Sequence, residues 1–198
     1  MSEHYYTGRP SSESRETAFE TAFAGETFRF VCDRGVFSIN ELDEGTRILL
    51  SSLPPLAGRI LDLGCGWGPV GVILGYKYPR AQIVMSDVNE RAAALAEKNL
   101  ALNGVKNARV VVSDGLEKVE GTFDAVITNP PIRAGKQVIY RLFDEALSRL
   151  AQGGRLYIVI RRQQGAESAL KYLKKANARV IEREKGYWVL CAGGESDE

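Results

Sequence analysis

The sequence has 198 residues, with 26 Lys and Arg against 25 Asp and Glu, so it fits one ordinary domain of almost no net charge. Apolar residues make up 44%, which permits a sizeable core and excludes collagen-like, coiled-coil and wholly disordered chains. The single histidine, His4, excludes His-based triads and multi-His metal sites. Three widely spaced cysteines argue against a disulfide framework and a zinc site. Without a membrane-length apolar run or a signal peptide, we expect a soluble, cytoplasmic protein that binds no metal; its oligomeric state stays open.

The first 58 residues are predicted to pack on the main domain as an arm, a small hairpin and a leading helix. Met1–Glu16 is polar and contains Gly and Pro, as extended arms do. Thr27–Cys32 and Val36–Ser38 are predicted to pair as the hairpin, and Asp43–Leu53 reads as the helix.

Residues 59–194 are predicted to form one domain in which strands alternate with helices. Several strand candidates are apolar on consecutive residues, which is typical of strands covered by helices on both faces of a sheet. Repeated strand–helix units predict a doubly wound, mostly parallel α/β sheet of seven strands. The first five predicted strands are Arg59–Gly64, Gln82–Asp87, Ala108–Asp114, Phe123–Asn129 and Arg155–Arg161, and the predicted helices are Val70–Tyr78, Asn89–Asn103, Lys136–Gln152 and Gly165–Asn177.

The last two predicted strands, Arg179–Glu184 and Tyr187–Ala192, are separated by only Lys185-Gly186. Two residues cannot form a parallel crossover, so this pair is predicted to be an antiparallel hairpin, with the last strand reversed. Residues 195–198 are expected to be an acidic tail.

A glycine-rich turn joins the first strand of the domain to its helix. Dinucleotide-binding turns need G-x-G-x-x-G, and that register would require glycine at Pro69. The spacing found instead matches the turn that holds the amino-acid part of S-adenosylmethionine, and a plain tight turn is the alternative. The candidate cofactor residues here are Asp62, Gly64, Cys65, Gly66 and Gly68.

Carboxylates follow at the ends of the next two strands. Asp87, followed by Val88, can accept both ribose hydroxyls of an adenosine. Asp114, followed by Gly115, can accept the adenine amino group. Either aspartate alone could be an ordinary turn former, but three features at successive strand ends favour a nucleoside site.

The fourth strand ends in Asn129-Pro130-Pro131-Ile132. The prolines hold Asn129 stiffly at the carboxyl edge of the sheet. Its side-chain oxygen and the Pro130 carbonyl can both accept hydrogen bonds from one planar amino group. That arrangement suits methyl transfer to a weakly nucleophilic nitrogen by positioning and electrostatics, without a strong base.

Together these motifs resemble class I S-adenosylmethionine-dependent methyltransferases of the small-domain (MTS) group. The segments His4–Pro10, Gly35–Ser38 and Leu42–Leu50 more closely resemble the catalytic half of the ribosomal RNA small-subunit methyltransferase C family, which methylates guanine N2 in 16S rRNA. The resemblance implies a Rossmann-like fold, S-adenosylmethionine as cofactor, Asn129 and Pro130 at the target amine, and Phe37, Asp43 and Thr46 near the cofactor entrance.

One position departs from the family pattern. The family's fourth motif ends in an aromatic residue that stacks on the flipped base, and Ile132 stands there in this sequence. Either another ring, Phe37 or Tyr140, supplies the stacking, or the substrate is not a typical base.

Basic residues suggest where RNA could bind. Residues 155–185 contain nine basic and three acidic residues, although solvated helix faces explain lysines such as Lys171 and Lys174 equally simply. Arg133 and Lys136 follow the Asn-Pro-Pro motif directly and are predicted to contact substrate.

The sequence thus predicts an N-methyltransferase for guanine N2 in ribosomal RNA, with ribosomal RNA or the small ribosomal subunit as partner. A protein glutamine-amide N-methyltransferase and a non-catalytic RNA-binding module are the alternatives.

Overall fold

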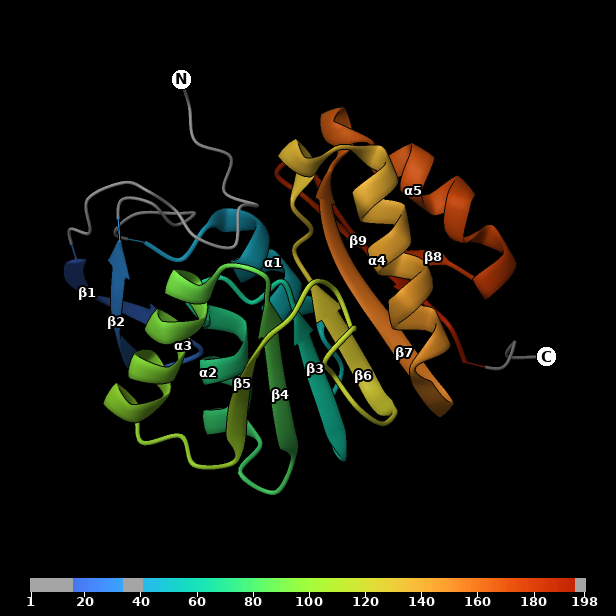
Figure 1. The fold of residues 1–198 in the computed structure, drawn as a ribbon. Helices are drawn as coiled ribbons and strands as arrows, with labels where there is room; N and C mark the ends of the chain where they lie inside the picture. The colour runs from blue at the N-terminus through green and yellow to red at the C-terminus, as the bar shows by residue number, and fades with distance from the viewer. Residues whose placement is uncertain (1–15, 34–40, 195–198) are drawn as a thin grey trace.

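The structure is a computed structural model that describes residues 16–33 and 41–194 (Figure 1). A seven-stranded sheet has the strand order β5-β4-β3-β6-β7-β9-β8, and a separate two-stranded sheet pairs β1 with β2. The strands are β1 (Glu16–Phe23), β2 (Glu26–Asp33), β3 (Arg59–Leu63), β4 (Gln82–Asp87), β5 (Ala108–Val112), β6 (Phe123–Thr128), β7 (Leu150–Arg161), β8 (Arg179–Glu184) and β9 (Tyr187–Ala192). The α-helices are α1 (Glu44–Ser52), α2 (Pro69–Lys77), α3 (Glu90–Leu102), α4 (Lys136–Ser148) and α5 (Ala166–Tyr172), and the short 3₁₀ turns are Ile132–Ala134, Arg162–Gln164 and Leu173–Ala176.

The main sheet confirms the predicted doubly wound architecture. Strands β3 to β7 pair in parallel, and β9 lies antiparallel between β7 and β8. From the central strand β3 the chain first adds β4 and β5 on one side and then crosses to β6 on the other. The carboxyl ends of β3 and β6 therefore flank the point where the winding direction changes, which is where open α/β sheets bind ligands.

Helices cover both faces of the sheet, which explains the apolar strands. On one face the sheet packs with β2, α1, α2 and α3, and on the other with α4 and α5 (Figure 1). Successive strand residues alternate between the two cores: Ile60 and Ile83 belong to the first, Leu61 and Val84 to the second. All four side chains are at most 2% exposed, so the sheet edge that carries the polar motifs rests on a rigid base.

The N-terminal hairpin differs from the prediction. Thr27–Cys32 does lie in a strand, but its partner is the preceding β1, whereas the predicted partner Val36–Ser38 lies outside the described residues. The turn is Ala24-Gly25, where both residues have positive φ, 52° and 85°. Hairpin turns of this kind usually show Asn-Gly or Asp-Gly, so Ala24 gave no signal. The predicted arm up to residue 15 and the acidic tail 195–198 also lie outside the described residues.

Two helix predictions are wrong at their C-terminal ends. The helix predicted to reach Gln152 stops at Ser148, and β7 starts at Leu150 because this residue pairs with Phe123 of β6. The helix predicted to reach Asn177 changes after Tyr172 into a 3₁₀ turn.

Within the described residues, no helix combines the length and apolarity that crossing a membrane requires.

Candidate functional site

The glycine loop follows β3 and turns sharply at the carboxyl end of the sheet. Gly64, Gly66 and Gly68 all have positive φ, at 72°, 55° and 93°, a region that L side chains rarely enter. At Gly68 a Cβ would lie 2.8 Å from Met85, whereas at Gly64 it would meet nothing within 4 Å. Gly68 thus permits close helix–strand packing, while at Gly64 no described residue stands where a ligand atom would approach the backbone.

Asp87 fixes this loop from the end of β4. Its Oδ2 accepts a hydrogen bond from the Gly66 N–H at 2.8 Å, and its Oδ1 accepts one from Asn89 at 2.9 Å. The side chain is only 5% exposed, and burial raises the pKa of its carboxyl. A carboxylate oxygen can accept more than one hydrogen bond, so Asp87 can brace the loop and still accept ribose hydroxyls. Val88, half-buried, follows it.

Asp62 lies deeper than the ligand-facing surface. Its Oδ2 accepts a hydrogen bond from the Gly71 N–H of α2 at 2.9 Å, so the carboxylate joins β3 to α2. Burial, with a smaller contribution from nearby Asp87, raises the pKa of Asp62 to about 7. Burial likewise raises the pKa of the free thiol of Cys65. The described contacts of Asp62 are to the protein's own backbone, which makes it a support of the loop.

Asn129 is held in place by α1. Its Nδ2 donates to the Asp43 Oδ1 at 3.3 Å and to the Thr46 Oγ1 at 3.2 Å. Asp43 also caps α1 by accepting from the Thr46 N–H. An ionised carboxylate only accepts hydrogen bonds, so the amide nitrogen must face Asp43. Among the described residues nothing bonds to the amide oxygen, which is left as a free acceptor.

The strand ends around Asn129 are tied together. The Thr128 Oγ1 donates to the Leu63 carbonyl at 2.8 Å, which joins the end of β6 to the end of β3. Pro130 is buried and Pro131 is half-buried, so the backbone that follows Asn129 is packed and stiff. The Asn-Pro-Pro motif and the glycine loop therefore form one continuous edge.

Two of the residues considered for base stacking, Ile132 and Tyr140, are half-buried. Ile132 packs against the core under α4. Tyr140 stacks on Tyr172, with ring centroids 3.8 Å apart, so that one of its faces is covered. Phe37 lies outside the described residues.

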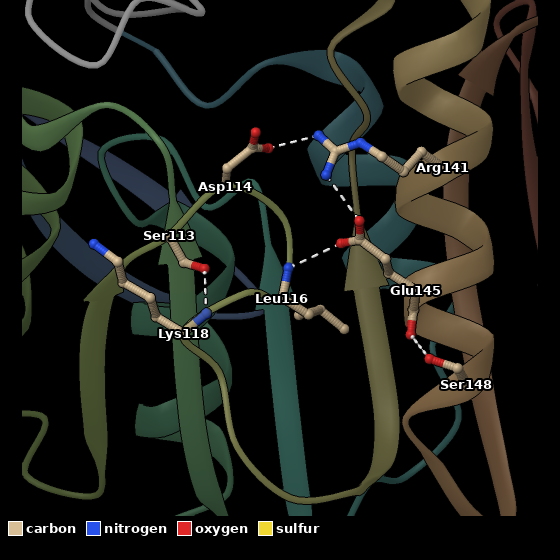
Figure 2. Close-up of polar contacts among 7 residues, drawn as sticks. All are labelled: Ser113, Asp114, Leu116, Lys118, Arg141, Glu145 and Ser148. Atoms are coloured by element: carbon tan, nitrogen blue, oxygen red, sulfur yellow. Dashed lines mark hydrogen bonds and ion pairs between the residues drawn. The ribbon is translucent and has the colours of Figure 1, made fainter.

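The loop after β5 forms the third part of the edge (Figure 2). Asp114 is exposed, and its Oδ1 accepts a hydrogen bond from the Arg141 Nη2 of α4 at 2.5 Å. Arg141 also donates to Glu145 at 2.8 Å, and Glu145 accepts from the Leu116 N–H at 2.9 Å. Gly115 is buried with a positive φ of 52°. The predicted adenine residues are therefore fastened to the helix that follows the Asn-Pro-Pro motif.

The predicted basic residues fall in two places. Arg133 and Lys136 are exposed beside the Asn-Pro-Pro motif, with the Lys136 ammonium 5.2 Å from the Tyr140 ring centroid. A second group lines a groove between α5 and the edge strand β8. This α5–β8 groove is lined by Glu167, Leu170, Lys171, Lys174, Ala178, Arg179, Val180 and Arg183. Within the described part of the chain, no carboxylate forms an ion pair with Lys171, Lys174 or Arg183.

The strand ends offer the groups that an S-adenosylmethionine molecule needs. Open space lies above Gly64, a fixed carboxylate stands at each of two neighbouring strand ends, and a free amide acceptor stands at Asn129. In residues 16–33 and 41–194 no three His, Cys, Asp or Glu side chains are placed to hold a metal ion. The residues present thus fit the cofactor predicted from the sequence.

Sequence reasoning did not foresee the side chains that hold these groups. Asp43 and Thr46 were expected near the cofactor entrance, but their contact with Asn129 was not predicted. Arg141 and Glu145 gave no signal, because an Arg and a Glu four residues apart look like an ordinary surface pair on a helix.

Comparison with known proteins agrees with this geometry. The family model described as "Methyltransferase small domain" matches residues 27–191. The chain is 40% identical to "Uncharacterized protein YbxB" of Bacillus subtilis, over 97% of this chain and 98% of that protein. It is 42% identical to "Ribosomal RNA small subunit methyltransferase C" of Pasteurella multocida, over 63% of this chain and 39% of that protein.

A solved structure is also similar over nearly the whole chain. It is the Thermus thermophilus 16S rRNA N2 G1207 methyltransferase RsmC in complex with AdoMet and guanosine, with a TM-score of 0.82 and 26% identity. The match covers 94% of this chain and 52% of that one, so this chain spans about half the length of that enzyme. With the family model matching residues 27–191, the chain belongs to the methyltransferase small domain family.

Proposed function

We propose that the protein transfers a methyl group from S-adenosylmethionine to guanine N2 in ribosomal RNA of the small subunit. The observation that carries this proposal is the orientation of Asn129, whose amide nitrogen is engaged by Asp43 and Thr46. The remaining amide oxygen is an acceptor for a planar amino group. Relatives named for 16S rRNA methylation and for small-subunit rRNA methylation support guanine N2 as the target.

The cofactor is proposed to lie across the ends of β3, β4 and β5. Its amino-acid part would occupy the space above Gly64, its ribose would bind Asp87, and its adenine amino group would bind Asp114. When bound, the cofactor supplies an electrophilic methyl group. The solved relative in complex with AdoMet supports S-adenosylmethionine as the cofactor.

The chain's own contribution to the reaction is positioning and electrostatics. The oxygen of Asn129 and the carbonyl of Pro130 would accept both N–H groups of the target amine and direct its lone pair at the methyl group. As positive charge develops on that nitrogen, the two acceptors stabilise it. No side chain has to act as a strong base, because the methylated amine is acidic enough to lose a proton to water.

The basic residues support an RNA substrate. Arg133 and Lys136 stand beside the target motif, and the α5–β8 groove adds Lys171, Lys174 and Arg183 along the edge of the sheet. Phosphate contacts of this kind give affinity without sequence preference. We also propose a cytoplasmic location, where the RNA is found and where cysteines that form no disulfide, such as Cys65 and Cys191, stay reduced.

The two alternatives receive less support. A glutamine-amide methyltransferase would use a similar motif, but the two methyltransferases matched above are named for ribosomal RNA. A non-catalytic RNA-binding module would have no need for an open glycine loop and a fixed Asn129.

The test is methyl transfer to small ribosomal subunits, and separately to naked 16S rRNA, from a strain that lacks this protein. We expect label from S-adenosyl-[methyl-³H]methionine to appear in N2-methylguanosine after nucleoside digestion. Label in another nucleoside would correct the target, and label in ribosomal protein with none in RNA would contradict the proposal.

A further inference from the structure

Arg141 of α4 stands out because it bridges two carboxylates that belong to different parts of the fold. One guanidinium nitrogen donates to Asp114, in the loop after β5, and another donates to Glu145, one turn along α4 (Figure 2). The planar guanidinium can hold both carboxylates at once, which a lysine ammonium cannot do with the same geometry. Neither Arg141 nor Glu145 contributes to the proposed reaction described above.

Glu145 fastens the same loop by a second route. Its Oε2 accepts a hydrogen bond from the backbone N–H of Leu116 at 2.9 Å. A Cβ at Gly115 would lie 2.0 Å from this oxygen, so the loop approaches Glu145 as closely as only glycine allows. The loop is therefore held on α4 both through the Asp114 side chain and through its own backbone.

We propose that Arg141, supported by Glu145, is a positioning residue that sets the selectivity of the nucleoside site for adenine. Asp114 is half-exposed at 52%, and an exposed carboxylate without a partner would sample several rotamers. Arg141 engages Oδ1, and among the described residues nothing bonds to Oδ2. The second oxygen is therefore kept in one orientation, in which it can accept the adenine amino group. Arg141's role rests on the proposed function, because adenine binding by Asp114 is part of it.

The same contacts connect the Asn-Pro-Pro motif with the proposed adenine acceptor, Asp114. Helix α4 begins at Lys136, one residue beyond the 3₁₀ turn Ile132–Ala134 that follows the Asn-Pro-Pro motif. The element that leaves the target motif is thus the element that orients the proposed adenine acceptor.

The test compares two ligands by calorimetry: S-adenosylhomocysteine and its inosine analogue, in which a carbonyl oxygen replaces the amino group. We expect the wild-type protein to bind the adenine ligand about tenfold or more tightly, as a hydrogen bond to a charged group allows. In Arg141→Met the ratio should fall to within about threefold. Arg141→Lys, which keeps the charge, should give an intermediate ratio. Arg80→Met, an exposed site in the turn before β4, should leave the ratio unchanged.

The outcomes separate this role from the proposed function. Arg141→Met with the wild-type preference for adenine would overturn the positioning role while the cofactor site stands. Were Arg141→Met to lose its fold, Arg141→Lys with an unchanged ratio would overturn the role equally. A wild-type protein that binds neither ligand would overturn the proposed function itself, and the positioning role with it.

Discussion

The two sides of the site are built by different means. On the cofactor side, Asp87 holds the glycine loop through the backbone N–H of Gly66, 21 residues away, and both belong to consecutive strand–helix units. On the target side, Asn129 is held by Asp43 and Thr46, which lie 86 and 83 residues earlier in the chain. The cofactor side is thus a local construction, whereas the target side depends on how α1 packs against the sheet.

Burial also differs within the cofactor side. Asp62 and Asp87 are 2% and 5% exposed, while Asp114 and Arg141 are 52% and 40% exposed in their side chains. Buried carboxylates that brace backbone make a preformed cradle. Asp114 is exposed, and its ion pair with Arg141 holds it in place of burial. Because the cofactor side holds the proposed ligand and the target side holds the proposed acceptor, changes on the cofactor side should alter binding, and changes on the target side should alter the rate of transfer.

The largest effect is expected for Asn129→Ala, which should impair methyl transfer and leave cofactor affinity almost unchanged. Loss of the acceptor should lower the rate of methyl transfer at least about a hundredfold, because stabilisation of the developing charge is removed. Affinity for S-adenosylhomocysteine, measured by calorimetry, should stay within about threefold of wild type. An Asn129→Ala protein with normal turnover would refute the assigned role.

Asp87→Ala should have the opposite effect and weaken cofactor binding. Removing the carboxylate should weaken cofactor binding by roughly 2–4 kcal/mol, the cost of losing a charge-assisted pair of hydrogen bonds. Because Asp87 also braces Gly66, thermal unfolding should be followed alongside calorimetry. Unchanged affinity in a folded variant would remove Asp87 from the site.

Thr46→Val tests whether the hydrogen bond from Asn129 orients the amide on the target side. Valine has nearly the shape of threonine but cannot accept the hydrogen bond from Asn129, so the amide should lose part of its fixed orientation. We expect kcat to fall about tenfold and KM for the RNA to change little. Asp43→Asn, which retains an acceptor oxygen for both the helix cap and Asn129, is the matched control. A larger loss in the control than in Thr46→Val would contradict this order.

The α5–β8 groove should affect RNA affinity alone. Lys171→Glu combined with Arg183→Glu should weaken RNA binding about tenfold in low salt and make its dependence on salt less steep. Lys77→Glu combined with Lys106→Glu makes the same change in charge at exposed positions elsewhere. Equal losses in the two double variants would mean that only net charge matters.

The last prediction is a pH dependence of stability that belongs to the cofactor side. Asp62 has a pKa of about 7 in the fold against an ordinary 3.8, so the folded chain holds this proton more tightly than the unfolded chain. Its contribution is full below about pH 4 and is lost as the pH rises through 7. Asp62→Asn cannot ionise, so its free energy of unfolding relative to wild type should rise between pH 4 and 8. If Asp62→Asn differed from wild type by the same free energy of unfolding at both pH values, the raised pKa would be contradicted.

Local patterns predicted most of the fold. The strands Gln82–Asp87, Arg179–Glu184 and Tyr187–Ala192 were predicted to the residue, because turn residues and helix caps bound each of them. The hairpin partner β1 was missed because its turn at Ala24 lacks the usual residues. The start of β7 at Leu150 was missed because its pairing with Phe123 is a tertiary contact.

The same division holds for the site. The glycine loop and the Asn-Pro-Pro motif are contiguous in sequence, so their spacing could be read directly. The side chains that orient them could not, because Thr46 meets Asn129 only after the chain has wound through β3 and β6. Arg141 and Glu145 form a pair that many exposed helices carry. The pair differs from such pairs because it also bonds Asp114 and Leu116 in the loop after β5.

The most direct test of the central claim is a crystal structure of the protein grown with S-adenosylhomocysteine. We expect the ribose on Asp87, the adenine amino group on Asp114, and the sulfur facing the amide oxygen of Asn129. A ligand found elsewhere, or an empty edge at saturating concentration with wild-type side chains filling the space above Gly64, would contradict it.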